Sequence, residues 1–318
     1  MYKKSFIVNV NARRVDKKLI EKIKKLYPHS PVHIENPERF PQMFDEIVNK
    51  DRPDVIVWIT GDGGGHLYAT DTFRLFETRD VPPVLIGPSG TFNVFSKALG
   101  QSKIWTLDPL APVRKLDKCE SLEETVCNLI KVEREGEQPL FCWSATSGLI
   151  YNLFEMYNEK KSFVNGARMV VQTMASFYMK DLMKKHHERM LGKREYSMVV
   201  DGKQMNGEFN GIAVYSIPIS LLGFKPPYSN DLQVMAGDFG SIDPLVFYKR
   251  GIMGQRIGLE IERPASEVVF ENAGMTIVDG DDYDFQKPVK MTSYPMRVVS
   301  FEKTRCMTPD PVLEGVTL

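Results

Sequence analysis

Residues 55–65 read VIVWITGDGGG, a run of β-branched and aromatic residues that ends in a glycine-rich turn. Residues 83–93, PVLIGPSGTFN, repeat this pattern about thirty residues further along the chain. A short, near-continuous apolar run is typical of a strand that is covered on both faces. Glycines at the end of such a strand let backbone N–H groups approach an anion closely. The two stretches together predict a phosphate-binding edge of an open α/β sheet.

The first of these turns contains an acid, Asp62. Backbone N–H groups alone can hold a phosphate, whereas a carboxylate is needed where Mg²⁺ or a hydroxyl proton is handled beside it. The two turns are therefore interpreted as a nucleotide-phosphate site that carries chemistry. The alternative is a pair of tight strand-to-helix turns without a ligand, in which Asp62 only stabilises its own turn.

The sequence around the two turns alternates between strand and helix patterns up to about residue 135. Residues 17–26, for example, are amphipathic, with Leu19, Ile23 and Leu26 on one face. Because βαβ crossovers make neighbouring strands parallel, this alternation predicts a doubly wound α/β domain with a parallel sheet over residues 1–135. Its strands are expected at residues 5–10, 31–34, 54–59 and 83–86, and its helices at residues 17–26 and 41–49.

A charged, glycine-containing run at residues 132–137, VEREGE, marks the predicted domain boundary. Beyond it, regularly spaced short strands predict a β-sandwich-like C-terminal domain over residues 136–305. Asp201 and Gly202 are a typical hairpin turn, and residues 306–318 are expected to form a tail. The strands are expected at residues 140–145, 196–200, 211–217, 232–236, 245–248, 257–262, 268–271, 275–278 and 296–301, and the helices at residues 149–158 and 166–191.

Composition narrows the class of protein. The chain has 42% hydrophobic and 26% charged residues, and its 41 Lys and Arg balance 41 Asp and Glu. This neutral charge argues against bulk nucleic-acid binding, which needs a basic surface. No stretch approaches the roughly 20 apolar residues of a membrane span, and no signal peptide is found, so a cytoplasmic protein is expected. The oligomeric state stays open, a homodimer included.

The four cysteines lack the spacing of a metal site. Cys119 and Cys127 are eight residues apart, in or near one predicted helix. Reduced, mostly buried thiols are therefore expected at Cys119, Cys127, Cys142 and Cys306.

The two glycine-rich turns resemble the signatures of the diacylglycerol kinase catalytic family, which includes bacterial lipid kinases and sphingosine kinases. The GGDGT signature of the family corresponds to residues 60–67, TGDGGGHL, and its PxGTxNDFAR signature with a following Leu-Gly to residues 88–100, PSGTFNVFSKALG. Residues 7–12 are similar to the Asn-Pro element, residues 147–152 to the segment that meets the lipid headgroup, and residues 278–281 to the late Asp-Gly-Glu motif. The resemblance implies a two-domain, ATP- and Mg²⁺-dependent lipid kinase whose β-rich domain receives a lipid at the membrane surface.

The implied nucleotide site draws on both signatures. The glycines would supply backbone donors and clearance for the triphosphate, Thr91 a hydroxyl, and Asn93 a contact to the nucleotide or to the first turn. Asp62 matches the family's near-invariant acid, which would contact Mg²⁺ or orient the turn. His66 would contact a phosphate, or else be a solvent-facing turn residue. The predicted cofactor-binding residues are Asn9, Gly61, Asp62, Gly63, Gly64, Gly65, His66, Gly90, Thr91 and Asn93.

Three further site residues follow from the resemblance. Asp281 takes the place of the Glu that removes the proton of the lipid hydroxyl, so Asp281 is the predicted general base and, with Asp62, a predicted catalytic residue. The alternative is a solvated hairpin turn. Asp238 is predicted to be associated with the metal, with an ordinary loop carboxylate as the alternative. Asn152, where sphingosine kinases carry an acid that contacts the lipid, is the predicted substrate-binding residue.

The sequence also departs from the family signatures. Gly64 replaces a Thr, Leu67 a Glu, Val94 an Asp and Val10 a Pro. A divergent substrate or a catalytically silent nucleotide-binding relative therefore stays open. A kinase of a soluble substrate, similar to NAD kinase, is a further alternative that shares the GGDG turn, although the Asn-Glu element of that family is not found here. The long match at residues 92–100 favours the lipid kinase.

Overall fold

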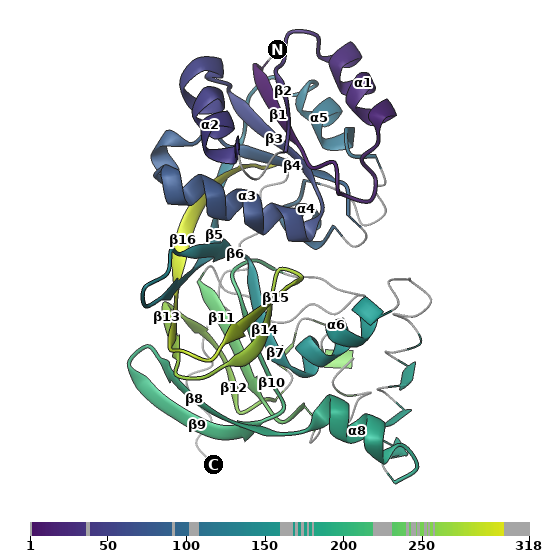
Figure 1. Ribbon diagram of the computed structural model, residues 1–318, viewed down its shortest axis with the longest axis vertical. Helices are drawn as coiled ribbons and strands as arrows, with labels where there is room; N and C mark the ends of the chain where they lie inside the picture. Colours follow the sequence, from purple (N-terminus) through teal and green to yellow (C-terminus); the bar gives the residue numbers. More distant parts are fainter. Residues whose placement is uncertain are drawn as a thin grey trace.

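The structure is a computed structural model with two stacked parts, shown in Figure 1. It describes residues 2–35, 39–90, 93–101, 108–159, 181–218, 231–239 and 258–301, together with residues 168, 171–172, 175–176, 178–179, 242, 246, 249–250, 253 and 255–256.

Four parallel strands form the sheet of the N-terminal part, in the order β2-β1-β3-β4. Every residue of β1, β3 and β4 is buried. This burial follows from the apolar runs, because helices cover both faces of the sheet. The strands are β1 (Lys4–Val8), β2 (Val32–Ile34), β3 (Val55–Thr60) and β4 (Val84–Pro88).

Two groups of helices cover this sheet (Figure 1). Helices α1 (Lys17–Leu26) and α5 (Ala111–Leu116) pack in one apolar core with β1, β3 and β4. Helices α2 (Phe40–Asp45), α3 (Asp62–Leu75) and α4 (Val94–Ala98) pack in a second core on the other face. The predicted doubly wound α/β architecture is thereby confirmed. Short helical segments at η2 (Glu46–Asp51) and η3 (Thr78–Asp80) complete this part.

The C-terminal part is a sandwich of two sheets around one large apolar core. One sheet has the antiparallel order β12-β11-β10-β7-β14-β15. Its strands are β7 (Ser144–Gly148), β10 (Gly211–Tyr215), β11 (Leu232–Gly237), β12 (Ile261–Ala265), β14 (Gly274–Val278) and β15 (Asp281–Phe285). The opposite layer contains β5 (Glu124–Arg134), β6 (Leu140–Cys142), β8 (Arg194–Val200), β9 (Lys203–Phe209), β13 (Glu267–Phe270) and β16 (Val289–Val299). Helices α6 (Leu149–Glu159) and α8 (Lys184–Leu191) lie beside the sandwich (Figure 1). The predicted β-sandwich-like architecture is confirmed.

Strand β16 belongs to both parts of the molecule. It pairs with β5 along its whole length, with β13 near its start, and with β4 of the parallel sheet near its end. Figure 1 shows β16 as a yellow ribbon that runs from the lower part into the upper one. One continuous ten-stranded sheet therefore connects the two parts.

The side chain of Gln101 reinforces the junction between β4 and β16. Its Nε2 donates to the carbonyl oxygens of Val84 (3.1 Å) and Val299 (2.8 Å), and its Oε1 accepts from the backbone N–H of Ile86 (2.7 Å). β4 and β16 share only one register pair, Val298 with Val84. The buried amide thus supplies contacts that the short ladder lacks.

Replacing Gln101 by Ala is expected to lower the free energy of unfolding by about 3 kcal/mol, because three buried backbone groups lose their partner. Urea denaturation measures this change. Gln42 is exposed on α2, and its replacement by Ala serves as a control that is expected to stay within about 0.5 kcal/mol. Equal stability of the two variants would contradict the bridging role of Gln101.

The structure corrects the sequence-based expectation around Cys127. Residues 124–134 form strand β5, so Cys127 lies in a strand and not in or near a helix. The pairing of β5 with β16, which is more than 150 residues away, stabilises this strand. Cys119, Cys127 and Cys142 are free, and burial raises the pKa of Cys127 to about 12. Cys306 and the predicted tail lie outside the described residues.

Other strand and helix boundaries differ from their expected positions. The single strand predicted at residues 140–145 is divided at Trp143 into β6 and β7. Residues 281–285, for which no strand is predicted, form β15. Of the helix predicted at residues 166–191, the last part forms α8. The earlier part lies mostly outside the described residues. The strand predicted at residues 245–248 lies, except for Val246, outside them as well.

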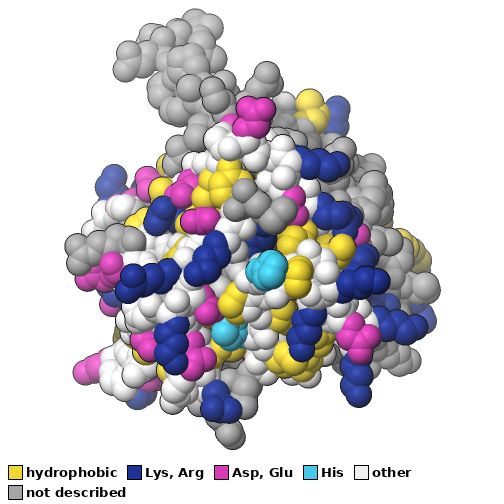
Figure 2. All heavy atoms as spheres, turned by 90° about the horizontal axis from the view of Figure 1, so that it is seen from above, with side chains coloured by type: hydrophobic (Ala, Val, Ile, Leu, Met, Phe, Trp, Pro, Cys, Tyr) yellow, Lys and Arg dark blue, Asp and Glu magenta, His cyan; other side chains and the backbone are white. Residues whose placement is uncertain are grey.

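The surface of the N-terminal part carries charges of both signs. Figure 2, which views this part from above, shows Lys and Arg interspersed with Asp and Glu. Attraction of an anion to this face must therefore come from local groups and not from a field of one sign. Among the helices in the described part of the chain, none is long and apolar enough to cross a membrane.

Candidate active site

The first glycine-rich turn forms the beginning of helix α3. This helix starts at Asp62, directly after β3, with Gly61 as its N-cap, and no side chain caps it. The N–H of Gly65 donates to the carbonyl oxygen of Gly61 at 3.1 Å. The N–H groups that precede it belong to the positions that a helix leaves without an internal acceptor. At the start of a helix, such N–H groups and the helix dipole together favour the binding of an anion such as phosphate.

Gly64 and Gly65 allow this first turn to pack closely on both parts of the molecule. A Cβ atom at Gly64 would overlap the Oγ1 of Thr60 and the Nδ2 of Asn9. A Cβ atom at Gly65 would lie 3.1 Å from the ring of Trp143. The glycines therefore have a steric role in addition to the role that the signature implies. The side chain of Asp62 is outside the description.

The second glycine-rich turn is held by Asn93. Its Oδ1 accepts from the N–H of Gly90 (2.7 Å), and its Nδ2 donates to the carbonyl oxygen of Gly90 (3.1 Å). Asn93 has a φ of 51°, in the left-handed region that asparagine tolerates. Because its amide is buried and engaged with Gly90, Asn93 shapes this turn. Thr91 lies outside the described residues.

The two turns lie next to each other, because β3 and β4 are neighbours. A Cβ atom at Gly61 would be 3.0 Å from the Cα of Gly90. Asn9, after the end of β1, contributes from the other side: its Nδ2 lies 3.5 Å from the Oγ1 of Thr60. The carboxyl ends of three parallel strands therefore bring together Asn9, Gly61, Gly64, Gly65, Gly90 and Asn93.

The C-terminal part contacts this edge through Trp143. The Trp143 ring is fully buried, lies against Gly65, and stacks at a tilt on Phe95 with 4.6 Å between the ring centroids. Asp279 fixes the backbone at this point: its carboxylate accepts from the N–H groups of Trp143 (2.8 Å) and Ser144 (2.7 Å), and from the Ser144 hydroxyl (2.8 Å). The sandwich and both glycine-rich turns thus form one packed unit.

Asp281 lies beside α3, at the start of β15. Its Oδ2 is 3.6 Å from the Nδ1 of His66, and its side chain is 50% exposed. His66 itself is completely buried, which excludes the solvent-facing alternative for this residue. The Nε2 of His66 also lies 3.2 Å from the hydroxyl of Tyr283. The structure therefore places the half-exposed carboxylate of the predicted base next to helix α3.

Asp238 does not lie near this carboxylate. Asp238 follows β11 at the end of the sheet marked by Gly148, whereas Asp281 is at the opposite end. Asp238 is paired with Lys193 at 2.8 Å and accepts from the Nδ2 of Asn210 at 2.8 Å. A metal-associated role for Asp238 stays a prediction.

The amide of Asn152 is used within the protein. Its Nδ2 donates to the carbonyl oxygens of Arg189 (2.9 Å) and Met190 (3.4 Å), so it joins α6 to α8. The side chain is also buried. The contact of Asn152 with a lipid headgroup stays a prediction. In the structure, the N–H groups of its amide donate to backbone carbonyl oxygens.

The described residues contain no preformed metal-binding cluster. Among them, no group of three or more His, Cys, Asp or Glu side chains is placed to hold a metal ion. Mg²⁺ in kinases is usually held by one or two carboxylates, water and substrate phosphates. The role of Asp62 beside Mg²⁺ stays a prediction, because its side chain lies outside the description.

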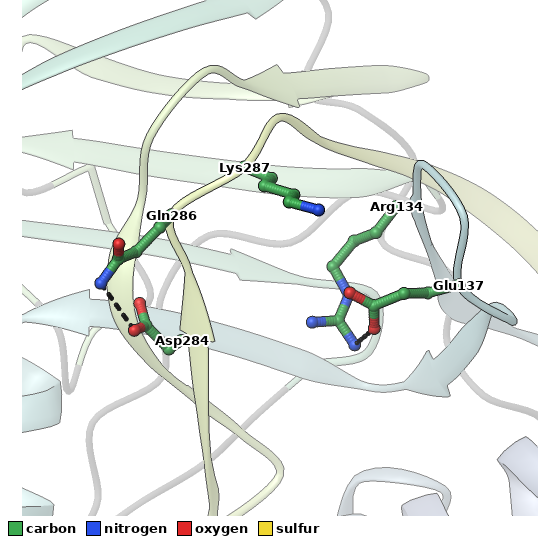
Figure 3. Close-up of a pocket in the computed structure, with 5 residues that line it drawn as sticks. All are labelled: Arg134, Glu137, Asp284, Gln286 and Lys287. Carbon is green, nitrogen blue, oxygen red and sulfur yellow. Dashed lines mark hydrogen bonds and ion pairs between the residues drawn. The ribbon is translucent and has the colours of Figure 1, made fainter.

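A separate surface hollow of about 260 Å³ lies near the turn between β5 and β6. Figure 3 shows its lining, in which Arg134 is paired with Glu137 at 2.5 Å and the Nε2 of Gln286 donates to Asp284 at 2.8 Å. The hollow is smaller than typical ligand sites of roughly 300–1,000 Å³. None of the residues that line it belongs to the glycine-rich turns, so it is distinct from the candidate active site.

Sequence reasoning missed the roles of Trp143, Asp279 and Tyr283. Each acts through a partner that is distant in the chain: Asp279 lies 136 residues from Trp143, and Tyr283 lies 217 residues from His66. Burial, followed by the charge of Asp281, raises the pKa of Tyr283. The only local signal was the hairpin pattern at residues 279–282, which does not indicate the partners.

Comparison with known proteins agrees with this architecture. Residues 5–127 match the family model of the diacylglycerol kinase catalytic domain. No curated protein matches the chain in sequence. A Bacillus anthracis protein assigned as a diacylglycerol kinase superposes with a TM-score of 0.64 at 15% identity, covering 94% of this chain and 98% of that one. A diacylglycerol kinase structure from the same organism gives a TM-score of 0.59 at 15% identity, covering 94% and 97% of the two chains.

The two kinds of likeness cover different extents of the chain. At this low identity, the solved structures show a shared fold that extends over both parts of the molecule. The match of residues 5–127 to the family model adds a likeness in sequence for the N-terminal part. The resemblance to diacylglycerol kinases predicted from the sequence is thereby confirmed.

Proposed function

We propose that this protein is an ATP- and Mg²⁺-dependent kinase that transfers the γ-phosphate of ATP to a hydroxyl of diacylglycerol or a related lipid. One observation carries the proposal: the half-exposed carboxylate of Asp281 lies 3.6 Å from His66 of α3, whose N-cap is Gly61 and whose first turn has no side-chain cap. A base and a phosphate-binding helix in contact are the two parts that such a transfer requires.

The proposed reaction uses these parts in order. The first N–H groups of α3 and the turn at Gly90 hold the phosphates and leave the γ-phosphorus open toward β15. Asp281 takes the proton of the acceptor hydroxyl while the hydroxyl oxygen attacks the γ-phosphorus. The bond from the γ-phosphorus to the β–γ bridging oxygen breaks, and ADP leaves with the electron pair. Bound Mg²⁺ would neutralise phosphate charge, with Asp62 as the predicted residue beside it.

A lipid acceptor is proposed because the family model that matches residues 5–127 is that of diacylglycerol kinases. A lipid substrate requires the protein to meet a membrane surface, so we propose a cytoplasmic enzyme with transient peripheral association. The exposure of Asp281 is compatible with an acceptor that arrives from outside the protein.

Transfer of ³²P from labelled ATP tests the proposal. The wild-type protein with Mg²⁺ is incubated with diacylglycerol, with sphingosine or with a total lipid extract in mixed micelles, and in parallel with soluble acceptors such as NAD. A labelled lipid that requires both Mg²⁺ and the protein supports the proposal. Label only in a soluble acceptor would overturn the lipid assignment, and label in neither, despite ATP binding, would overturn the kinase activity.

A further inference from the structure

His66 is a completely buried imidazole at the contact between the two parts of the molecule. His66 belongs to α3, and the two side chains that its ring nitrogens face, Asp281 and Tyr283, belong to β15. Its Nε2 lies 3.2 Å from the Tyr283 hydroxyl and its Nδ1 lies 3.6 Å from Oδ2 of Asp281. Residues two apart on a strand point to the same face, so one ring contacts both side chains.

The position of Tyr283 determines which ring nitrogen of His66 faces which side chain. Its ring meets the His66 ring edge-on, with 6.2 Å between the centroids, and also lies 6.0 Å from the ring of Phe285. Because the pKa of Tyr283 is raised by burial and by Asp281, its hydroxyl keeps its proton and can donate to the Nε2 of His66. When Nε2 accepts this hydrogen bond, the ring proton of His66 is on Nδ1, which faces Asp281.

We infer that His66 is a positioning residue that holds the carboxylate of Asp281 at the phosphate-binding turn, with Tyr283 setting the orientation of its ring. This inference rests on the proposed function and deepens it. A separation of 3.6 Å lets the N–H and the carboxylate attract each other while leaving the carboxylate free to accept a proton. The role differs from that predicted from the sequence, because both ring nitrogens of His66 face side chains of β15.

The position of His66 in α3 links the base to the nucleotide. His66 directly follows Gly64 and Gly65, which pack the first turn of α3 against Asn9, Thr60 and Trp143. A change in this turn therefore moves the ring to which Asp281 is held. The base reaches its working position only when the turn that binds phosphate is in place.

Enzyme kinetics distinguish this role from nucleotide binding. His66→Gln is expected to lower kcat about tenfold, with the KM for ATP within about twofold, because misplacement of a catalytic group acts on the chemical step. The double variant with Asp281→Asn is expected to be no less active than Asp281→Asn alone. His29→Gln, an exposed histidine, is the matched control and is expected to be unchanged. Multiplying effects in the double variant, or a rise in KM alone, would overturn the inference.

A second measurement does not need turnover. Hydrogen exchange of residues 281–285 in the ligand-free protein is expected to be about fivefold faster in His66→Gln and in Tyr283→Phe than in the wild type. Tyr283→Phe keeps the ring in place and serves if His66→Gln does not fold. Unchanged exchange in a folded variant would overturn the inference. Faster exchange in a protein that phosphorylates no acceptor would instead overturn the proposed function and leave the contact established.

Discussion

Replacing Asp281 by Asn should lower kcat for phosphoryl transfer by at least about 100-fold, while ATP binds with an affinity within about twofold of the wild type. The amide has almost the same shape as the carboxylate and cannot accept the hydroxyl proton, and general-base catalysis typically contributes 10²–10⁴ in rate. Steady-state transfer assays measure kcat, and titration calorimetry with ATP measures the affinity.

Asp284 provides the matched control for this experiment. It is an exposed carboxylate on the same strand, β15, and its Oδ2 accepts from Gln286. Asp284→Asn should retain wild-type kcat. If Asp281→Asn were as active as Asp284→Asn, the base would have to be another group and Asp281 would be an ordinary hairpin residue.

Asp279→Ala should lower the free energy of unfolding by about 4 kcal/mol. The carboxylate accepts three hydrogen bonds from Trp143 and Ser144, and its removal leaves one buried and one partly buried backbone N–H group without that acceptor. The residue also has a φ of 49°, which Ala adopts less readily than Asp or Asn. Urea denaturation followed by tryptophan fluorescence measures the change, since Trp143 is at the site.

Two variants calibrate that result. Asp279→Asn keeps an acceptor oxygen and tolerates the left-handed conformation, so its loss should be less than half of that of Asp279→Ala. Asp282→Ala, at an exposed position of the same hairpin, should stay within about 0.5 kcal/mol. A loss for Asp279→Ala that does not exceed that of Asp282→Ala would show that the three hydrogen bonds do not stabilise the fold.

Local patterns predicted the elements whose causes are local. Helix α1 spans Lys17–Leu26 as predicted, because its apolar residues recur on one face and Asp16 caps its first turn by accepting from the N–H of Leu19 at 2.8 Å. The parallel strands likewise follow from apolar runs bounded by turns. β5 was missed because its stability comes from β16, a partner that no window of sequence around residue 127 contains.

The candidate site divides in the same way. The glycine signatures predicted that Gly61, Gly64 and Gly90 meet at one edge, and they do, because carboxyl ends of parallel strands share an edge. The contact of Asp281 with His66 could be predicted only in part, since each residue was a candidate but their proximity depends on how the sandwich docks on α3. Physical reasoning on a single sequence does not supply that docking.

The shared strand β16 has a consequence for how the chain folds during synthesis. β4 lacks its neighbour, and the Gln101 amide lacks the Val299 carbonyl, until residues 289–299 have emerged from the ribosome. The N-terminal sheet therefore cannot reach its final form while it is the only part made, although domains commonly fold in order of synthesis. Until β16 is made, the edge of β4 stays unpaired and can pair with other strands. The two parts are thus completed together, late and as one cooperative unit.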